Sequence, residues 1–350
     1  MEIEKLITYQ EVVDSLKKKK RKKHFLFGNG FSMAYDSGIF SYNALSKFIE
    51  NTGDPIIRNL FEKLNTKNFE LIMQQLDNFC EIASVFSDDK TLVPKIKAAS
   101  EKLKNSLIDA VKELHPEHVF KIPEENSKSC VGFLQEYLDN EGFVFSTNYD
   151  LLPYWVLMRN SVKNAIDGFG RDLETDIDDY VGDEDLEYSE LRWGKHKKDQ
   201  NVFYLHGTLP FFDTGVNIVK VEYDSEHYLL QNVKERIDKK EYPIFVTAGN
   251  GKEKLTHIMH NKYLSYCYEQ LGNIEGSLVT FGFNFGEYDT HIIDAINNAS
   301  KMGRKIPEKL WSVYVGVFSD EDLNHIREIE KKFKCKVIPY NARTANIWNK

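Results

Sequence analysis

Three short polar segments lie far apart in this chain, and each directly follows an apolar run of the kind that forms β-strands. They are Gly28-Asn29-Gly30-Phe31-Ser32, Ser146-Thr147-Asn148-Tyr149-Asp150 and His206-Gly207-Thr208. In an open parallel α/β sheet, ligands bind at the carboxyl ends of the strands, so three such endings can converge on one cleft. Together they offer a glycine loop for a phosphate, an Asn/Asp pair that orients a ligand and a histidine that accepts a proton. The pattern predicts a nucleotide-binding enzyme.

The rest of the chain alternates between β-prone and helical patterns. Further strands are expected at 244–246, 278–281, 313–317 and 337–338, and helices at 252–272, 287–301 and 320–333. Strands that alternate with helices of this length form parallel sheets. We therefore expect an α/β fold with a Rossmann-like, doubly wound and mostly parallel sheet.

A long helical stretch interrupts this alternation after the first strand. Glycine is absent from residues 54–131, as a helical region favours. We expect residues 43–126 to form a helical insertion that covers the cleft or carries an oligomer contact. The Rossmann-like core then consists of residues 1–42, with an N-terminal helix, the first strand and the glycine loop, and of residues 127–350, which begin with a helix at 127–140.

Two charged segments are expected to lie at the surface, and for each a specific functional role is the alternative. An amphipathic pattern predicts a helix over residues 3–20, which runs into the basic segment 17–23. We expect a solvated helix end, where cations interact favourably with the helix dipole; the alternative is a docking patch for nucleic acid or an acidic partner. Residues 172–190 contain ten Asp or Glu residues without the spacing of a calcium loop. A solvated acidic loop, which can also act as a lid, is favoured there over a metal site.

Composition argues against several classes of protein. The net charge of −8 argues against a general nucleic-acid-coating role. No apolar run approaches the roughly 18 residues of a membrane span, and we expect no secretory leader. The four cysteines are too scattered for a disulfide framework or a CxxC zinc site. These features predict a protein of the reducing cytoplasm.

The order of glycine loop, Asn-x-Asp and His-Gly resembles that of the sirtuin-like proteins, especially their bacterial NAD-hydrolysing branch. Residues 147–152 and 204–209 are most similar to a bacterial sirtuin-like family labelled only as a domain of unknown function. Sirtuin-family deacylases usually carry two CxxC zinc pairs after the His-Gly segment, whereas only Cys267 and Cys335 follow it here. The resemblance therefore implies NAD cleavage rather than protein deacylation.

The resemblance assigns the glycine loop to the NAD pyrophosphate. Gly28, Gly30 and Ser32 match the family's Gly-Ala-Gly-x-Ser loop, with Asn29 in place of alanine. Met33 stands where the standard dinucleotide fingerprint has its third glycine, so the loop is not that fingerprint. On the residues alone, a glycine turn that merely closes a β–α corner is the alternative.

The resemblance also assigns the catalytic residues. Asn148 and Asp150 match an asparagine that orients ribose or water and an aspartate that contacts the nicotinamide amide. Alternate residues of an extended segment share one side, although Asn-x-Asp alone is more often a polar turn. His206 matches the general base. His257 and His260 lack the glutamate and the spacing of a zinc-hydrolase helix, so we expect them to be non-catalytic.

A fourth segment follows the strand predicted at 278–281. In the family a Gly-Thr-Ser segment here holds the adenosine ribose; Gly282 matches it, and Asn284 offers donor and acceptor groups in place of serine. Asp289 is expected to cap the helix that begins near residue 290, with ribose binding as the alternative. Residues 37–43 depart from the family's Ser-Gly-Ile and Pro-Asp-Phe-Arg segments.

The resemblance as a whole implies an enzyme that hydrolyses NAD+ to nicotinamide and ADP-ribose, with NAD as the substrate and no metal required. In the resembling proteins this activity depletes NAD during phage infection, so we expect restraint by a homo-oligomer or a partner, such as a hexameric ATPase of the HerA class. Two other classes remain open: a deacylase or ADP-ribosyl transferase, and a non-catalytic NAD or ADP-ribose sensor. A sensor needs neither Asn148 nor His206, which disfavours it.

Overall fold

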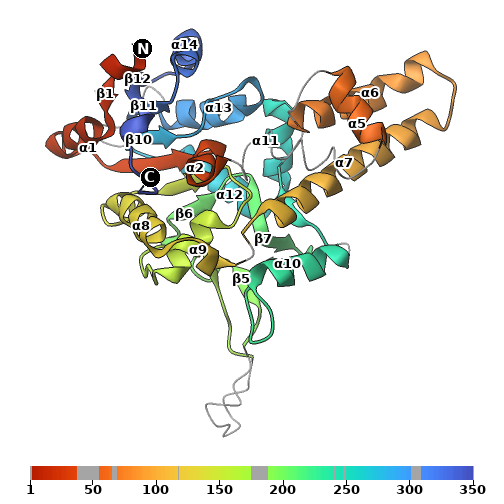
Figure 1. The fold of residues 1–350 in the computed structure, drawn as a ribbon, viewed down its shortest axis with the longest axis horizontal. Coiled ribbons are helices and arrows are strands. Elements are labelled where there is room, and N and C mark those ends of the chain that lie inside the picture. Colours follow the sequence, from red (N-terminus) through yellow and green to blue (C-terminus); the bar gives the residue numbers. More distant parts are fainter. Residues whose placement is uncertain are drawn as a thin grey trace, which may run out of the picture.

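Seven parallel strands form the central sheet (Figure 1). The computed structural model describes residues 2–37, 55–64, 69–116, 118–174, 188–239, 241–246, 250–300 and 309–349. The strands lie side by side in the order β1-β12-β11-β10-β2-β3-β6, and every neighbouring pair is parallel. Their bounds are β1 Ile7–Thr8, β2 Lys23–Phe27, β3 Val144–Ser146, β6 Val202–Tyr204, β10 Gly276–Phe281, β11 Leu310–Val317 and β12 Lys336–Asn341.

The order of these strands confirms the doubly wound fold. From β2 the chain moves outward to β3 and β6, returns to β10 on the other side of β2, and continues to β11 and β12. This is the 3-2-1-4-5-6 order of dinucleotide-binding sheets, with the short β1 added at one edge. The order reverses between β2 and β10, and ligands bind in such sheets at this switch point.

Helices cover both faces of the sheet. The ring of Phe25 on β2 stacks on Tyr137, with centroids 4.9 Å apart. Leu26 points to the opposite face of the sheet. Phe203 of β6 is aligned with Leu26 across the intervening strand β3, so its side chain lies on the same face as Leu26. Phe203 in turn contacts Tyr266, with centroids 6.3 Å apart. The helices that carry Tyr137 and Tyr266, α8 and α12, therefore lie on opposite faces.

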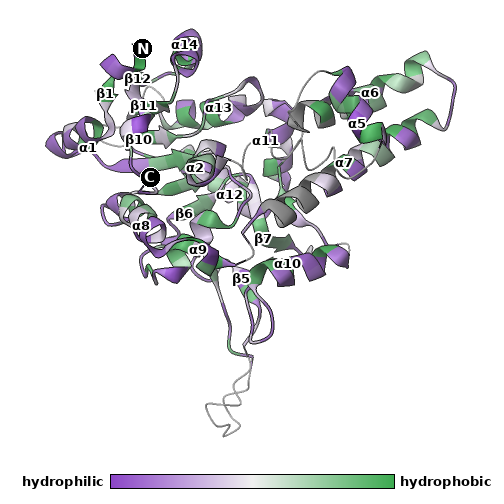
Figure 2. Cartoon of the chain, viewed as in Figure 1, coloured by the Kyte–Doolittle hydropathy of each residue, from purple (hydrophilic) through white to green (hydrophobic). Residues whose placement is uncertain are grey.

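The helices of this core surround the sheet in Figure 1. They are α1 Tyr9–Lys18, α2 Asn29–Tyr35, α8 Glu124–Leu138, α9 Leu152–Arg159, α11 Gly251–His260, α12 Lys262–Leu271, α13 Thr290–Ala299 and α14 Asp320–Ile329. Hydrophobic residues gather in the strands between them, whereas α1 and α14 carry mostly hydrophilic residues (Figure 2). Within the described ranges, no helix is long and apolar enough to cross a membrane.

A second sheet has five antiparallel strands, and the sequence patterns predict neither this sheet nor four of its strands. Its order is β4-β5-β8-β7-β9, and α10 (Leu229–Asp238) packs on β7. The strands are β4 Phe169–Gly170, β5 Leu191–Trp193, β7 Gly207–Asp213, β8 Ile218–Lys220 and β9 Pro243–Phe245. The strand expected at 244–246 therefore exists, but its assignment to the parallel sheet is wrong.

The chain passes from the parallel sheet into the antiparallel one at Gly207, whose φ of +79° favours glycine. A Cβ on Gly207 would lie only 1.8 Å from the carbonyl oxygen of Ile244. β7 and β9 can approach this closely because residue 207 has no side chain. The apolar run of β9 is thereby paired with β7, an arrangement that periodicity alone cannot distinguish from a parallel strand.

The single helix expected over residues 3–20 is wrong. Residues 2–5 form a 3-10 turn, Ile7 and Thr8 pair with β12, and α1 begins only after Thr8. Thr8 forms a capping box with Glu11: its hydroxyl accepts from the Glu11 N–H, and its own N–H donates to Glu11 Oε2 at 2.7 Å. This capping box starts a new helix and leaves the preceding residues free to pair with the sheet.

The helix expected over residues 252–272 is two helices, α11 and α12. Asn261 separates them in an extended conformation, and its side chain accepts hydrogen bonds from the backbone N–H groups of Tyr263 and Leu264. An asparagine side chain that bonds the backbone two and three residues ahead caps a new helix instead of continuing the old one.

The described part of the insertion expected at 43–126 contains three complete α-helices, which Figure 1 shows beside the core. They are α5 (Pro55–Lys63), α6 (Phe69–Phe86) and α7 (Leu92–Leu114), and they project from the side of the core opposite α1. They bury a small hydrophobic core of their own, formed by Ile57, Ile72, Leu76, Ala83, Ile96, Ala99 and Leu103. Residues 43–54, 65–68 and 117 of the expected insertion lie outside the described residues.

Candidate functional site

The hydroxyl group of Ser32 joins two of the predicted polar segments. Ser32 lies near the start of α2, after β2, whereas Asn148 and Asp150 lie in the loop after β3. Ser32 Oγ donates a hydrogen bond to Asp150 Oδ2 at 2.6 Å and accepts one from Asn148 Nδ2 at 2.8 Å. Because β2 and β3 are neighbouring parallel strands, their carboxyl ends meet at one edge of the sheet. Three predicted site residues therefore form one hydrogen-bonded cluster.

This Ser32–Asn148–Asp150 cluster is buried, with no member more than 5% exposed. Burial raises the pKa of Asp150 because it disfavours the charged carboxylate, while hydrogen bonds from Ser32 and from the Leu152 N–H oppose the shift. Asn148 Oδ1 is buried and accepts no hydrogen bond from any residue that the structure describes. A buried acceptor without a partner is costly, which makes this oxygen a candidate contact for a ligand donor.

The glycines of the first segment hold two strand-end loops together. The Gly28 N–H donates to the carbonyl of Phe281 at 3.2 Å, and the Gly30 N–H donates to that of Gly282 at 3.0 Å. A Cβ on Gly30 would lie 2.5 Å from Gly282 Cα. In this conformation, then, the amides predicted to bind phosphate are bonded within the protein, and the glycines permit a close loop–loop contact.

The other residues predicted to hold NAD lie around this contact. Asn29 is half-buried at the first position of α2, and Asn284 is exposed in the loop after β10. In the same loop Phe285 is buried with a φ of +53°, a left-handed conformation that is unfavourable for a bulky side chain. Residues 38–43, where the sequence departs from the family's segments, lie outside the described residues.

His206 lies between β6 and β7 and faces a second histidine. Its Nε2 atom is 2.9 Å from Nε2 of His291, which belongs to the first turn of α13. At this distance one nitrogen carries a hydrogen and the other accepts it. Burial lowers the pKa of His206 well below its usual value and that of His291 to about 3, and the positive charge of Lys254 lowers both further. Both rings are therefore neutral at pH 7.

Asp289 does not cap α13, so that prediction is wrong. Asp289 occupies the N-cap position, but its side chain makes no capping hydrogen bond. Its Oδ1 atom instead lies 3.1 Å from Nζ of Lys254, which is fully buried in α11. A cap contributes about 1 kcal/mol, whereas a buried ammonium without a counter-charge costs several kcal/mol. The ion pair therefore determines the orientation of Asp289.

Close packing of α11 on α13 brings these charges together. A Cβ on Gly251 would lie 1.9 Å from Thr290 Oγ1, so the close approach of the first turn of α11 to α13 favours glycine at this position. The side chain of Asn250 caps α11 and fixes where that turn begins. Lys254, one turn later, then reaches Asp289.

Backbone contacts join His206 and its neighbours to the Ser32–Asn148–Asp150 cluster. The Leu205 N–H donates to the carbonyl of Ser146 at 2.8 Å, and Thr208 Oγ1 donates to that of Tyr149 at 3.0 Å. On the other side, the Gly30–Gly282 contact joins the loop after β2 to the loop that leads into α13. The loops after β2, β3, β6 and β10 therefore meet at the switch point, as the sequence pattern predicts.

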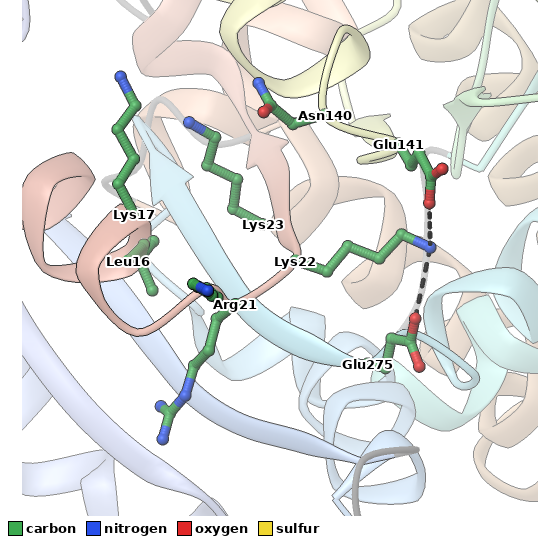
Figure 3. A pocket seen from close by; sticks show the side chains of 9 residues that line it. Leu16, Lys17, Arg21, Lys22, Lys23, Asn140, Glu141 and Glu275 are labelled. Atoms are coloured by element: carbon green, nitrogen blue, oxygen red, sulfur yellow. Dashed lines mark hydrogen bonds and ion pairs between the residues drawn. The ribbon is translucent and has the colours of Figure 1, made fainter.

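Two pockets in the described part of the structure lie away from these loops. One, of about 460 Å³, lies at the opposite edge of the sheet, where β2 and β10 begin, and is lined mainly by the basic segment 17–23 (Figure 3). There Lys22 forms ion pairs with Glu275 and Glu141, at 3.3 and 3.7 Å. The basic segment is thus partly neutralised by the chain itself. The other pocket, of about 340 Å³, lies beside α9 and β6.

A family model described as "Domain of unknown function (DUF4917)" matches the sequence over residues 25–348, nearly the whole chain. The chain belongs to the DUF4917 family. No curated protein matches it. Because the description of DUF4917 states no activity, the function of this site is inferred from its residues and geometry.

Two buried residues of this DUF4917 site, His291 and Lys254, are not predicted from the sequence. His291 stands two residues after Asp289, and the Asp-x-His at the start of the helix that follows the predicted strand 278–281 is a signal that would have found it. Lys254 lies on the expected helix 252–272, where its sequence neighbours do not distinguish it from a solvated lysine.

Proposed function

We propose that this protein is an NAD+ hydrolase, which cleaves the N-glycosidic bond of NAD+ to give nicotinamide and ADP-ribose. One observation carries the proposal: the Ser32–Asn148–Asp150 cluster and His206 lie on loops that meet at the switch point of the sheet. Nucleotides bind at this point in open α/β sheets. The resemblance to NAD-hydrolysing sirtuin-like proteins selects NAD+ among nucleotides.

The proposed chemistry uses the chain's own residues. Nicotinamide is a cationic group in NAD+ and leaves as a neutral molecule, so bond cleavage needs little acid catalysis, and its transition state resembles an oxocarbenium ion. Asn148 Oδ1, which has no hydrogen-bond partner among the described residues, accepts a hydrogen bond from the ribose or from the attacking water. His206 takes the proton of a ribose hydroxyl or of that water as its oxygen bonds to the anomeric carbon. Asp150 contacts the nicotinamide amide.

Binding requires the loops to separate. Asn148 and His206 are at most 5% exposed, and the Gly30 N–H is bonded to Gly282. We infer that NAD+ enters as the loop after β2 moves away from the loop after β10, which turns the Gly30 N–H toward the pyrophosphate. Because this step moves the Gly30 N–H from the Gly282 carbonyl to a phosphate, ADP-ribose should slow hydrogen exchange of the Gly30 amide; unchanged or faster exchange contradicts this step.

Analysis of the reaction products tests the proposal against the two other classes of protein, a deacylase or ADP-ribosyl transferase and a non-catalytic sensor. The purified chain is incubated with NAD+, with and without an acyl-lysine peptide, and nicotinamide, ADP-ribose and peptide are quantified by chromatography. Hydrolysis predicts equal amounts of nicotinamide and ADP-ribose whether or not the peptide is present. Loss of the acyl group identifies a deacylase, protein-bound ADP-ribose identifies a transferase, and binding without nicotinamide release identifies a sensor.

Such an activity needs restraint, and we propose that the protein is an NAD-depleting effector of antiphage defence that is controlled by assembly. One supporting observation is an exposed apolar stripe on α6, where Phe79, Ile82 and Phe86 are 45%, 50% and 82% exposed. Monomeric proteins rarely expose contiguous apolar surface of this kind. We assign the stripe to a contact between copies of the chain, and propose a HerA-class ATPase as the activating partner.

A further inference from the structure

The side chains of His206, His291 and Asp289 gather at the start of α13, the two histidines buried and Asp289 partly exposed. One ligand-type atom from each residue lies within 4.8 Å of those of the other two. Neutral imidazole nitrogens and carboxylate oxygens are ligands that Zn²⁺ and related transition-metal ions prefer. His206 comes from the β6–β7 junction, and the other two residues come from the start of α13. Tyr268 Oη donates a hydrogen bond to the His291 carbonyl at 3.0 Å and helps to hold the start of this helix in place.

The distance between the two Nε2 atoms suits a shared metal ion. With Zn–N bonds of about 2.0–2.1 Å, two tetrahedral imidazole ligands lie about 3.3 Å apart, and two ligands at right angles lie about 2.9 Å apart. The observed separation is 2.9 Å. For the two histidines, tetrahedral binding therefore needs the Nε2 atoms to move apart by only a few tenths of an ångström, and the Asp289 carboxylate lies within 4.8 Å of both.

We propose that His206, His291 and Asp289 form a reversible site for a divalent transition-metal ion, with Zn²⁺ as the ion that fits best. Three protein ligands leave at least one coordination position open, as in catalytic rather than structural zinc sites. One consequence rests on the proposed function, in which His206 is the general base. An ion bound to Nε2 of His206 occupies the lone pair that the base requires, so Zn²⁺ inhibits NAD+ cleavage.

Two features keep the affinity moderate. The ammonium group of Lys254 lies 3.1 Å from Asp289 Oδ1 and repels a second cation. Nδ1 of His291 is buried and has no hydrogen-bond partner in the described part of the chain, whereas ligating histidines usually have an outer partner that raises metal affinity by about 10–100-fold. We therefore expect a dissociation constant in the micromolar range, and tighter binding once the charge of Lys254 is removed.

Zinc binding by the full chain, measured by competition with a chromogenic zinc indicator, tests the site without reference to NAD. We expect the wild-type chain to bind one more Zn²⁺ than His291→Ala. The matched control is His257→Ala with His260→Ala, which removes a histidine pair on the exposed side of α11 and leaves the proposed site intact. Asp289→Asn, at a partly exposed position, provides a second variant should His291→Ala not fold, and should weaken binding at least tenfold.

The Lys254→Met variant tests the site most sharply in the zinc-binding experiment. Because it removes the repelling charge, it should bind Zn²⁺ at least tenfold more tightly than the wild-type chain. Equal zinc binding by the wild type, His291→Ala and Asp289→Asn overturns the site, as does weaker binding by Lys254→Met. NAD+ cleavage is then followed with and without saturating Zn²⁺. Cleavage that zinc leaves unchanged overturns the inhibition, whereas absence of cleavage in metal-free protein refutes the proposed function and leaves the zinc result standing.

Discussion

Gly30 and Gly282 pack backbone to backbone across the switch point of the sheet. The Gly30 N–H donates to the Gly282 carbonyl at 3.0 Å, and Gly282 adopts a φ of +61° that favours glycine. The contact joins the loop after β2 to the loop after β10. In the proposed function both loops hold NAD+, so loop contact and ligand binding compete for the same backbone groups.

Gly30→Ala should destabilise the fold. The new Cβ lies 2.5 Å from Gly282 Cα, a backbone atom that cannot rotate away, and overpacking of this kind costs roughly 1–3 kcal/mol. Urea unfolding measures the change. Gly132→Ala is the control, since no atom lies within 4 Å of its Cβ and alanine stabilises a helix interior by roughly 0.5–1 kcal/mol. Equal stability of the two variants would show that the close contact is not required.

The carboxyl edge of the sheet could be predicted because polar residues follow short apolar strands directly. That pattern placed Ser32, Asn148 and His206 at one edge before their contacts were known. The antiparallel sheet could not be predicted, because β4, β5 and β8 have only two or three residues each and show no period. The ion pair of Lys254 and Asp289 could not be predicted either, because it depends on packing between helices that are separate in sequence.

Stability should fall as the pH drops below about 6.5, the ordinary pKa of histidine. His24 accepts from the Phe143 N–H through Nδ1 at 3.0 Å and is buried, which lowers its pKa to about 3. Burial lowers the pKa of His115 to about 4. Between these values and 6.5 the unfolded chain binds more protons than the folded one, so each histidine lowers the free energy of unfolding by about 1.4 kcal/mol per pH unit.

His115→Gln isolates one of these contributions. The Nε2 atom of His115 accepts from the Leu151 N–H at 2.9 Å, and a glutamine oxygen can take the same bond without titrating. Urea unfolding at pH 7, 6 and 5 should therefore show a shallower loss of stability in this variant than in the wild type. An identical slope would mean that His115 is not held neutral in the folded protein.

Ser32→Ala should impair both stability and NAD+ cleavage. It removes the donor to Asp150 and the acceptor of Asn148 Nδ2, and leaves buried polar atoms without partners at a cost of roughly 1–3 kcal/mol. We expect kcat to fall at least tenfold, because Asn148 loses its orientation. Ser129→Ala, whose hydroxyl makes only a 3.4 Å contact, is the control and should behave as the wild type. Wild-type turnover in folded Ser32→Ala would remove this cluster from the proposed site.

Ile82→Glu combined with Phe86→Glu should convert the proposed oligomer into a monomer. Both side chains are at least 50% exposed on α6, so the substitutions should not disturb the fold but should oppose apolar association. Light scattering coupled to size-exclusion chromatography gives the mass. Glu81→Lys, on the same helix, serves as a control for altered charge. A wild-type chain that is already monomeric at all concentrations would rule out this interface.

The rate of nicotinamide release by the wild-type chain and by His206→Ala, at saturating NAD+, tests the central claim most directly. We predict that the wild type releases nicotinamide and ADP-ribose in equal amounts. The variant should keep its circular dichroism spectrum and lose about 10²–10⁴-fold in rate, the usual contribution of a general base. A folded His206→Ala chain with wild-type turnover would contradict the account, as would a wild-type chain that releases no nicotinamide.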